Sequence, residues 1–107
     1  MNFADKVYSL LKQIPNGHVT TYKALARALN TKAYQAIGQA LKRNPYAPAV
    51  PCHRVIKSNG DLGGYCGQTT GEKILRKKRL LENEGIVFSG NKIKDLNQIF
   101  QDFKPLS

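Results

Sequence analysis

The sequence predicts a single, mainly α-helical domain with a few short strands. Its 107 residues suffice for one modest hydrophobic core and are too few for two independent cores. Helical spacing of apolar residues or capping signals mark five segments: residues 3–14, 22–29, 32–43, 72–83 and 95–103. Residues typical of strands occur only in short runs, at 18–20, 55–56 and 86–88. We therefore treat residues 1–107 as one domain.

The N-terminal part is predicted to hold three helices. The first ends at the turn signal Pro15-Asn16-Gly17. Thr21 can cap the second helix, and Thr31 can cap the third after a break at Asn30. Residues 22–43 should therefore form two helices joined by a tight turn, which is a helix-turn-helix arrangement.

The two faces of the third helix have different compositions. An apolar stripe is expected to face the core and consists of Ala33, Ala36, Ile37, Ala40 and Leu41. The opposite face is polar, basic and without carboxylates, and it consists of Gln35, Gly38, Gln39, Lys42 and Arg43. Such side chains can meet base edges and phosphates, and Gly38 would let the backbone approach a duplex. The pattern favours a DNA-recognition helix, although an ordinary solvated helix face would have the same composition.

The overall charge also favours nucleic acid as a partner. Lys and Arg total 17 against 7 Asp and Glu, which gives a net charge of +10 and suits a polyanion. The same balance would also suit a basic protein that binds no nucleic acid. No apolar run resembles a signal peptide or a membrane span, so we expect no membrane association. The two cysteines and two histidines lack paired spacing, so we expect no metal site and a reducing compartment.

Prolines occupy every third position ahead of Cys52. This spacing predicts an extended, semi-rigid strap over residues 44–51, before a short strand at Val55 and Ile56. A cysteine is nucleophilic only as a thiolate, so Cys52 would need an activator. His53 is adjacent but would reach the thiol only through a turn or a bridging water. The alternative is a buried, inert cysteine at the start of a strand.

The C-terminal part alternates turns with basic elements. Residues 58–61 should form a turn, and residues 63–67 a flexible loop that carries Tyr65 and Cys66. The helix at 72–83 is strongly basic through Lys73, Arg76, Lys77, Lys78 and Arg79, with Ile74, Leu75 and Leu81 assigned to the core. Gly85 is its expected C-terminal cap. A strand at 86–88 and a last amphipathic helix at 95–103 complete the prediction.

At Pro51-Cys52-His53-Arg54-Val55 the chain resembles the active-site motif of the O6-alkylguanine-DNA alkyltransferases. The resemblance covers roughly residues 3–88. Its other matching stretches follow in family order: Ile14-Pro15-x-Gly17-x-Val19-x-Thr21-Tyr22-x-x-Leu25-Ala26, Ala36-Ile37-Gly38, Asn44-Pro45, Leu62-Gly63-Gly64-Tyr65 and Leu80-Leu81-x-x-Glu84-Gly85. It implies a winged-helix-like DNA-binding domain that contains the helix-turn-helix. This domain is expected to stand alone, without the family's N-terminal domain and its zinc site, and to need no cofactor.

The resemblance implies direct reversal of DNA damage. The family flips O6-alkylguanine out of duplex DNA and transfers the alkyl group irreversibly to its cysteine. By this resemblance Cys52 is the nucleophile, His53 activates it through a water molecule, and Glu84 orients His53. Asn44 holds the turn after the recognition helix, and Tyr22 donates a hydrogen bond or a proton to the departing guanine.

The resemblance also implies a DNA-binding surface and a base pocket. The expected DNA contacts are Tyr34, Gln35, Gly38, Gln39, Lys42 and Arg43, and the expected pocket residues are Pro51, Val55, Tyr65, Cys66 and Gly67. The family commonly has arginine at the position of Gln35, where it fills the gap left by the extruded base. Glutamine can still bond the orphaned cytosine, but it lacks the charge and the stacking plane. Tyr34 is a second candidate for the wedge.

Two other functions stay open. Alkyltransferase-like proteins bind alkylated guanine without repairing it, but they typically carry tryptophan in place of the cysteine, and this chain has no tryptophan. A winged-helix transcription regulator would explain the basic surface but not Pro51-Cys52-His53-Arg54. We expect a monomer acting on double-stranded DNA that contains O6-alkylguanine. It would be cytoplasmic and nucleoid-associated in a prokaryote, and nuclear in a eukaryote.

Overall fold

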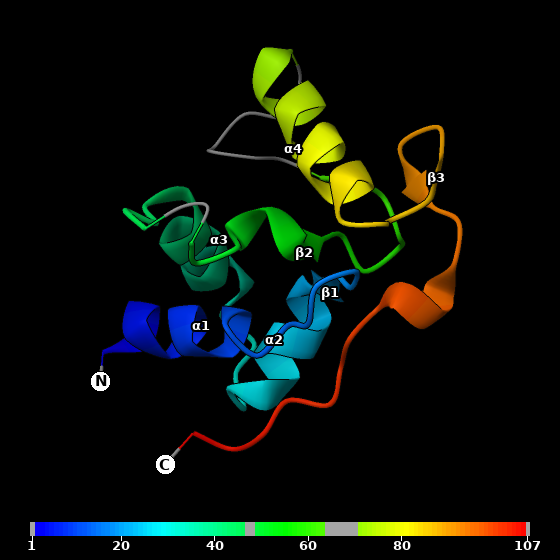
Figure 1. Cartoon of the computed structure of the whole chain (residues 1–107). Coiled ribbons are helices and arrows are strands. Elements are labelled where there is room, and N and C mark those ends of the chain that lie inside the picture. Colours follow the sequence, from blue (N-terminus) through cyan, green and yellow to red (C-terminus); the bar gives the residue numbers. More distant parts are fainter. Residues whose placement is uncertain (1, 47–48, 64–70, 107) are drawn as a thin grey trace.

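The computed structural model describes residues 2–46, 49–63 and 71–106 (Figure 1). Its elements are α1 (Phe3–Leu11), β1 (Thr20–Thr21), α2 (Tyr22–Ala28), α3 (Tyr34–Lys42), η1 (Cys52–Arg54), β2 (Val55–Ile56), α4 (Glu72–Asn83), β3 (Phe88–Ser89), β4 (Lys92–Ile93) and η2 (Leu96–Gln98), where η is a 3₁₀ helix. The predicted class, mainly α with short strands, is confirmed. None of the helices in these ranges is long and apolar enough to cross a membrane.

Side-chain caps determine where the first two helices begin. Asn2 Oδ1 accepts the backbone N–H of Asp5 at 2.8 Å and starts α1. Thr21 Oγ1 accepts the N–H of Ala24 at 3.1 Å and starts α2, as predicted. α1 ends at Leu11, before the predicted residue 14, because residues 12–13 already form a turn ahead of Pro15.

The third helix starts later than predicted. Thr31 Oγ1 accepts the N–H of Ala33 at 3.1 Å, so it stabilises the turn and does not cap a helix at Lys32. α3 begins at Tyr34 without a side-chain cap. The predicted stripe is narrower in consequence: Ile37, Ala40 and Leu41 are buried, whereas Ala33 and Ala36 are exposed. α2 and α3 pack against each other as the predicted helix-turn-helix.

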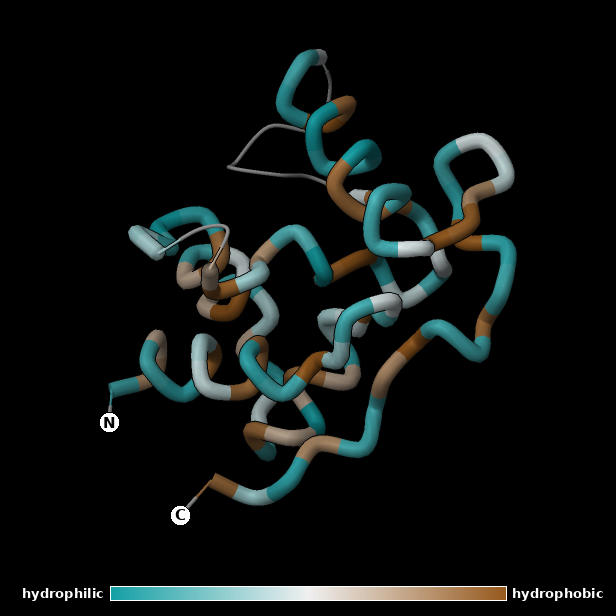
Figure 2. Tube along the Cα trace, in the orientation of Figure 1, coloured by the Kyte–Doolittle hydropathy of each residue, from teal (hydrophilic) through white to brown (hydrophobic). Residues whose placement is uncertain are grey.

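The buried side chains form two clusters. The first lies where α1, α2, α3 and residues 50–55 meet, and it includes Cys52. The second joins Val19, Ile56, Leu62, Leu81, Ile86 and Ile93. Figure 2 shows the hydrophobic residues gathered toward these regions, while much of α4 is hydrophilic. The segment from Cys52 to Ile56 therefore runs from one cluster into the other.

A short parallel pairing brings two distant segments together. Thr20 pairs with Val55 and Thr21 with Ile56. Tyr22 directly follows β1 and Cys52 lies three residues before β2, so this pairing places the start of α2 near η1. The predicted strand at 55–56 is confirmed.

The predicted extended strap is wrong over the described residues. Pro45, Tyr46 and Ala49 lie in turns, and Val50 N–H donates to the Tyr46 carbonyl at 3.1 Å. The chain folds back because Asn44 bonds at both ends of the turn: Nδ2 donates to the Val50 carbonyl at 2.8 Å, and Oδ1 accepts the Tyr46 N–H at 3.0 Å. Proline fixes φ, but it is as compatible with turns as with extended chain.

Helix α4 matches its predicted bounds, but its faces differ from the prediction. Leu75, assigned to the core, is 48% exposed, whereas Lys77, assigned to the basic surface, is 1% exposed. The helix ends in a Schellman motif: Ile86 N–H donates to the Leu81 carbonyl and Gly85 N–H to the Glu82 carbonyl, each at 3.0 Å. Gly85 has φ +96°, the left-handed conformation that this motif needs.

The C-terminal part forms a hairpin and an irregular tail. β3 and β4 pair in antiparallel fashion, so the predicted strand at 86–88 lies later, at Phe88–Ser89. The predicted helix at 95–103 is wrong, because only η2 forms there. From the end of η2 onward the chain is held to the loop before β1: Val19 N–H donates to the Gln98 carbonyl at 2.8 Å, and Phe100 N–H to the Val19 carbonyl at 2.6 Å.

We predict that Gly85→Ala lowers the free energy of unfolding by about 1 kcal/mol, because alanine is strained at positive φ. The midpoint of thermal unfolding should fall by about 4–8 °C. Gly38→Ala is the matched control. It lies within α3 with no heavy atom within 4 Å of the added Cβ, so alanine there should stabilise by up to about 1 kcal/mol. Equal shifts of the same sign in both variants would contradict this account.

Candidate functional site

The nucleophile predicted from the sequence lies in a single 3₁₀ turn. Cys52, His53 and Arg54 form η1, directly after Pro51 and directly before β2. Cys52 N–H donates to the Val50 carbonyl at 2.9 Å, and Arg54 N–H donates to the Pro51 carbonyl at 3.0 Å. Cys52 is 6% exposed and His53 is 2% exposed. The chain thus supplies the turn that the sequence argument required between the two side chains.

Glu84, at the C-terminal cap of α4, holds one nitrogen of His53. The distance from His53 Nε2 to Glu84 Oε2 is 2.8 Å. An ionised carboxylate only accepts hydrogen bonds, so Nε2 carries the proton and donates it. The other nitrogen, Nδ1, is buried and has no hydrogen-bond partner among the described residues. In this tautomer Nδ1 carries the lone pair and is the nitrogen able to take a proton.

The environment favours neutral His53 beside ionised Glu84. Burial lowers the pKa of His53 more than the hydrogen bond and charge of Glu84 raise it, and the charges of Arg54 and Lys77 lower it further. Burial raises the pKa of Glu84, but hydrogen bonds from Arg54 and His53 outweigh burial and hold that pKa below its ordinary value. At neutral pH the pair is therefore a neutral imidazole bonded to a carboxylate, which is the state that a general base requires.

Arg54 completes the polar cluster on the other side of Glu84. Its Nε donates to Glu84 Oε1 at 2.8 Å and its Nη1 donates to the Ile14 carbonyl at 3.0 Å. A third contact joins Nη2 to Asn16 Oδ1 at 3.4 Å. The sequence argument placed Arg54 in the motif but gave its side chain no role.

Tyr22 lies at the start of α2, partly buried. Burial raises the pKa of its phenol, and the negative charge of an ionised Cys52 raises it further. The hydroxyl is therefore close enough to the sulfur to sense its charge, and it keeps its proton at neutral pH. A protonated phenol near a nucleophile can donate to a leaving group.

Sequence reasoning missed Lys77, a buried residue of α4. Its Nζ donates to the carbonyls of Val55 and Leu62, each at 2.7 Å. Burial lowers the pKa of Lys77 to about 8, and the Cys52 charge acts in the opposite direction. The attraction between ammonium and thiolate is mutual, so Lys77 favours the ionised form of Cys52. Its position in a run of basic residues predicted that it would be exposed. Lys77 nevertheless lies three residues after Ile74 and four before Leu81, so a helical wheel would have placed it on the same face as these two apolar residues.

The other predicted site residues fall into three groups. Pro51 and Val55 are buried next to Cys52, and Asn44 holds the turn that leads to Pro51. On α3 the predicted DNA contacts are accessible: Tyr34, Gln35, Gln39, Lys42 and Arg43 are exposed, and Gly38 has open space where a side chain would begin. Tyr65, Cys66 and Gly67 lie outside the described residues.

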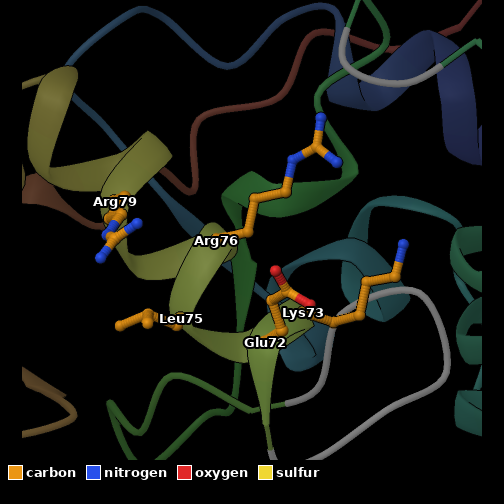
Figure 3. Close-up of a pocket in the computed structure, with 5 residues that line it drawn as sticks. All are labelled: Glu72, Lys73, Leu75, Arg76 and Arg79. Carbon is orange, nitrogen blue, oxygen red and sulfur yellow. The ribbon is translucent and has the colours of Figure 1, made fainter.

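A second basic surface lies on α4. Lys73, Arg76 and Arg79, with Glu72 and Leu75, line a cavity of about 580 Å³. Figure 3 shows Lys73 and Arg76 extending from one side of the helix and Leu75 from the other. Three cations against one carboxylate make this surface suitable for an anion such as a phosphate.

A comparison with protein families matches most of this chain to one family. The family described as the DNA-binding domain of 6-O-methylguanine DNA methyltransferase matches residues 2–86. A methylated-DNA–protein-cysteine methyltransferase from Thermococcus kodakarensis is 48% identical over 85 residues, 78% of this chain and 45% of that protein. The corresponding protein of Archaeoglobus fulgidus is 42% identical over 79% of this chain and 57% of its own length. The chain spans about half the length of the curated relatives it matches.

Two solved structures with DNA resemble the fold. The Mycobacterium tuberculosis protein OGT in complex with DNA has a TM-score of 0.69 at 40% identity, covering 78% of this chain and 50% of that one. Atl1 of S. pombe, in complex with damaged DNA containing O6-carboxymethylguanine, has a TM-score of 0.75 at 32% identity. The Atl1 comparison covers 92% of this chain and 94% of Atl1.

The buried lysine makes a prediction about pH. The pKa of Lys77 is about 8 in the folded chain, against an ordinary value of 10.5. Between these values the unfolded chain binds the proton and the folded chain does not, so stability rises with pH. Relative to Lys77→Met, the native free energy of unfolding should increase by about 2 kcal/mol from pH 8 to 10.

Urea unfolding at several pH values measures this difference. Lys23→Met, which removes an exposed lysine from α2, is the control and should track the native chain. A native chain that loses stability relative to Lys77→Met over this interval would contradict the assignment.

Proposed function

Because the chain belongs to the 6-O-methylguanine DNA methyltransferase family, through its DNA-binding domain, we propose that it repairs O6-alkylguanine in duplex DNA by transferring the alkyl group to Cys52. One observation carries the proposal. Glu84 occupies Nε2 of His53, so the remaining nitrogen of the imidazole is the basic one, on the residue that follows Cys52 in η1. These three residues suit the roles of a cysteine nucleophile, its base and an orienting carboxylate.

Transfer begins with ionisation of the thiol. His53 Nδ1 takes the thiol proton through a bridging water, and Glu84 stabilises the imidazolium that forms. Lys77 lies near enough to stabilise the thiolate electrostatically. The thiolate then attacks the alkyl carbon. A carbon–sulfur bond forms as the carbon–O6 bond breaks, and the bonding electron pair of the broken bond stays on the guanine.

The departing guanine carries a negative charge until a proton arrives. The phenol of Tyr22, protonated because its pKa is raised, donates to the base, and the imidazolium of His53 or solvent returns a proton to the phenolate. The products are unmodified guanine and a thioether at Cys52. A thioether offers no leaving group that water can expel, so each molecule acts once.

DNA would lie across the exposed cations. Lys42 and Arg43 extend the α3 face, and Lys73, Arg76 and Arg79 supply a second set of phosphate contacts on α4. Gln35, exposed on α3, would enter the gap left by the flipped guanine. Lys77 is buried and is not part of this surface.

A second candidate is lesion binding without transfer. It is favoured by one observation: Atl1, whose structure contains damaged DNA, is covered over 94% of its length, whereas OGT of M. tuberculosis is covered over 50%. Cys52 with its buried His53 and Glu84 argues for transfer, because a protein that only binds would not need an oriented base. Both candidates use the same DNA surface, and they differ in whether the sulfur of Cys52 takes the alkyl group.

We predict that the native chain gains one alkyl group per molecule when incubated with duplex DNA containing O6-methylguanine. Mass spectrometry of the intact chain gives the stoichiometry, and peptide mapping should place the methyl on Cys52 alone. Cys52→Ala should bind the same duplex and gain no mass, because the DNA surface does not include the sulfur.

Two outcomes would contradict this account. An unmodified Cys52 in a chain that demonstrably binds the duplex would favour the lesion-binding candidate. A methyl on Cys66 would mean that the wrong thiol has been assigned as nucleophile.

A further inference from the structure

The guanidinium of Arg54 joins three separate parts of the chain. It contacts Glu84 Oε1 at 2.8 Å, the Ile14 carbonyl at 3.0 Å and Asn16 Oδ1 at 3.4 Å. The first partner caps α4, and the other two lie in the loop between α1 and β1. A guanidinium is planar and its donors point in fixed directions, so the two shorter contacts, to Glu84 and Ile14, already determine the plane of the group as well as its position.

Glu84 uses its two oxygens for two different partners. Oε1 accepts from Arg54 and Oε2 lies 2.8 Å from His53 Nε2. The two oxygens rotate as one rigid unit about the side-chain bond. Whatever holds Oε1 therefore also determines where Oε2 points, and with it which nitrogen of His53 carries the proton.

Without its two partners, the Glu84 side chain would be poorly held in its present orientation. It lies at the C-terminal cap of α4, where a negative charge faces the negative end of the helix dipole. Its side chain is 19% exposed, so rotation toward solvent is sterically open once the Arg54 contact is lost. The charge-assisted hydrogen bonds from Arg54 and His53 offset both effects.

We propose that Arg54 is a positioning residue for alkyl transfer: it holds the Glu84 carboxylate so that His53 keeps its proton on Nε2 and its lone pair on Nδ1. This inference rests on the proposed function, and it adds a residue that acts through Glu84 without touching the reacting atoms. The alternative is a purely structural role, in which Arg54 only ties the loop at Ile14 and Asn16 to η1.

Single and double variants separate these roles. Arg54→Met should slow methyl transfer from a duplex containing O6-methylguanine by about 10- to 100-fold, the usual cost of losing an orienting partner. Asn16→Ala removes only the longest of the three contacts and should leave the rate unchanged. In an Arg54→Met/Glu84→Gln double variant the rate should equal that of Glu84→Gln alone, because Arg54 acts through Glu84. Rate losses that multiply in the double variant would overturn the proposal.

The pH response gives a readout that does not depend on transfer. The charged groups that face His53 are Glu84, Arg54 and Lys77, and Glu84 raises the pKa of His53 more than Arg54 lowers it. If Arg54 holds Glu84 in place, its loss should release the carboxylate and lower the pKa of His53. Titration of His53 followed by nuclear magnetic resonance should show this fall in Arg54→Met and not in Asn16→Ala, and the acid limb of the transfer rate should move to lower pH by the same amount. A raised pKa in folded Arg54→Met would show that Arg54 acts only as a nearby charge, and that result or an unchanged titration would overturn the proposal.

Arg54→Lys keeps the experiment decisive if the methionine variant does not fold. Lysine retains a positive charge but lacks the fixed fork, so we expect a smaller shift in the pKa of His53 and a transfer rate between those of the native chain and Glu84→Gln. A native rate in Arg54→Lys would show that charge alone suffices and that orientation is not the function of Arg54. If the native chain itself transfers nothing, the proposed function fails, while the His53 titration still tests the arrangement.

Discussion

The site depends on the two hydrogen bonds that the Glu84 carboxylate makes with its neighbours. It lies at the last turn of α4 and bonds to His53 and Arg54, which belong to a segment thirty residues earlier in the chain. Through Arg54 it also reaches the loop between α1 and β1. A single carboxylate thus holds together α4, the η1 turn that carries Cys52 and the segment that leads to Tyr22.

Local features of the fold place that carboxylate. The Schellman motif at Gly85 ends α4 one residue after Glu84, and Leu81 anchors the same turn in the second hydrophobic cluster. Lys77, one helical turn before Leu81, joins α4 to β2 and to Leu62 by donating hydrogen bonds to the carbonyls of Val55 and Leu62. Burying an ammonium is costly unless its donors are satisfied, so these bonds fix the rotation of α4 about its axis as well as its position. Glu84 is oriented toward η1 as a result.

Local signals predicted much of this architecture. Caps, apolar spacing and turn residues identified α1, α2 and α4, and the motif around Cys52 pointed to Cys52, His53 and Glu84, which lie together in the fold. The errors arose where distant contacts decide. Asn44 bends the segment that Pro45 was expected to extend, and Val19 holds the tail as irregular chain where apolar spacing predicted a helix. Lys77 escaped notice because a lysine is predicted to be exposed unless its buried partners, here backbone carbonyls, are known.

The most direct test of the account is the protonation state of His53 in the native chain at neutral pH. Nitrogen chemical shifts of a ¹⁵N-labelled imidazole distinguish the two tautomers and the cation. The account predicts a neutral ring with the proton on Nε2, bonded to Glu84, and a bare Nδ1. A ring protonated on Nδ1, or a fully protonated imidazolium at pH 7, would contradict the claim that Glu84 prepares His53 to act as a base for Cys52.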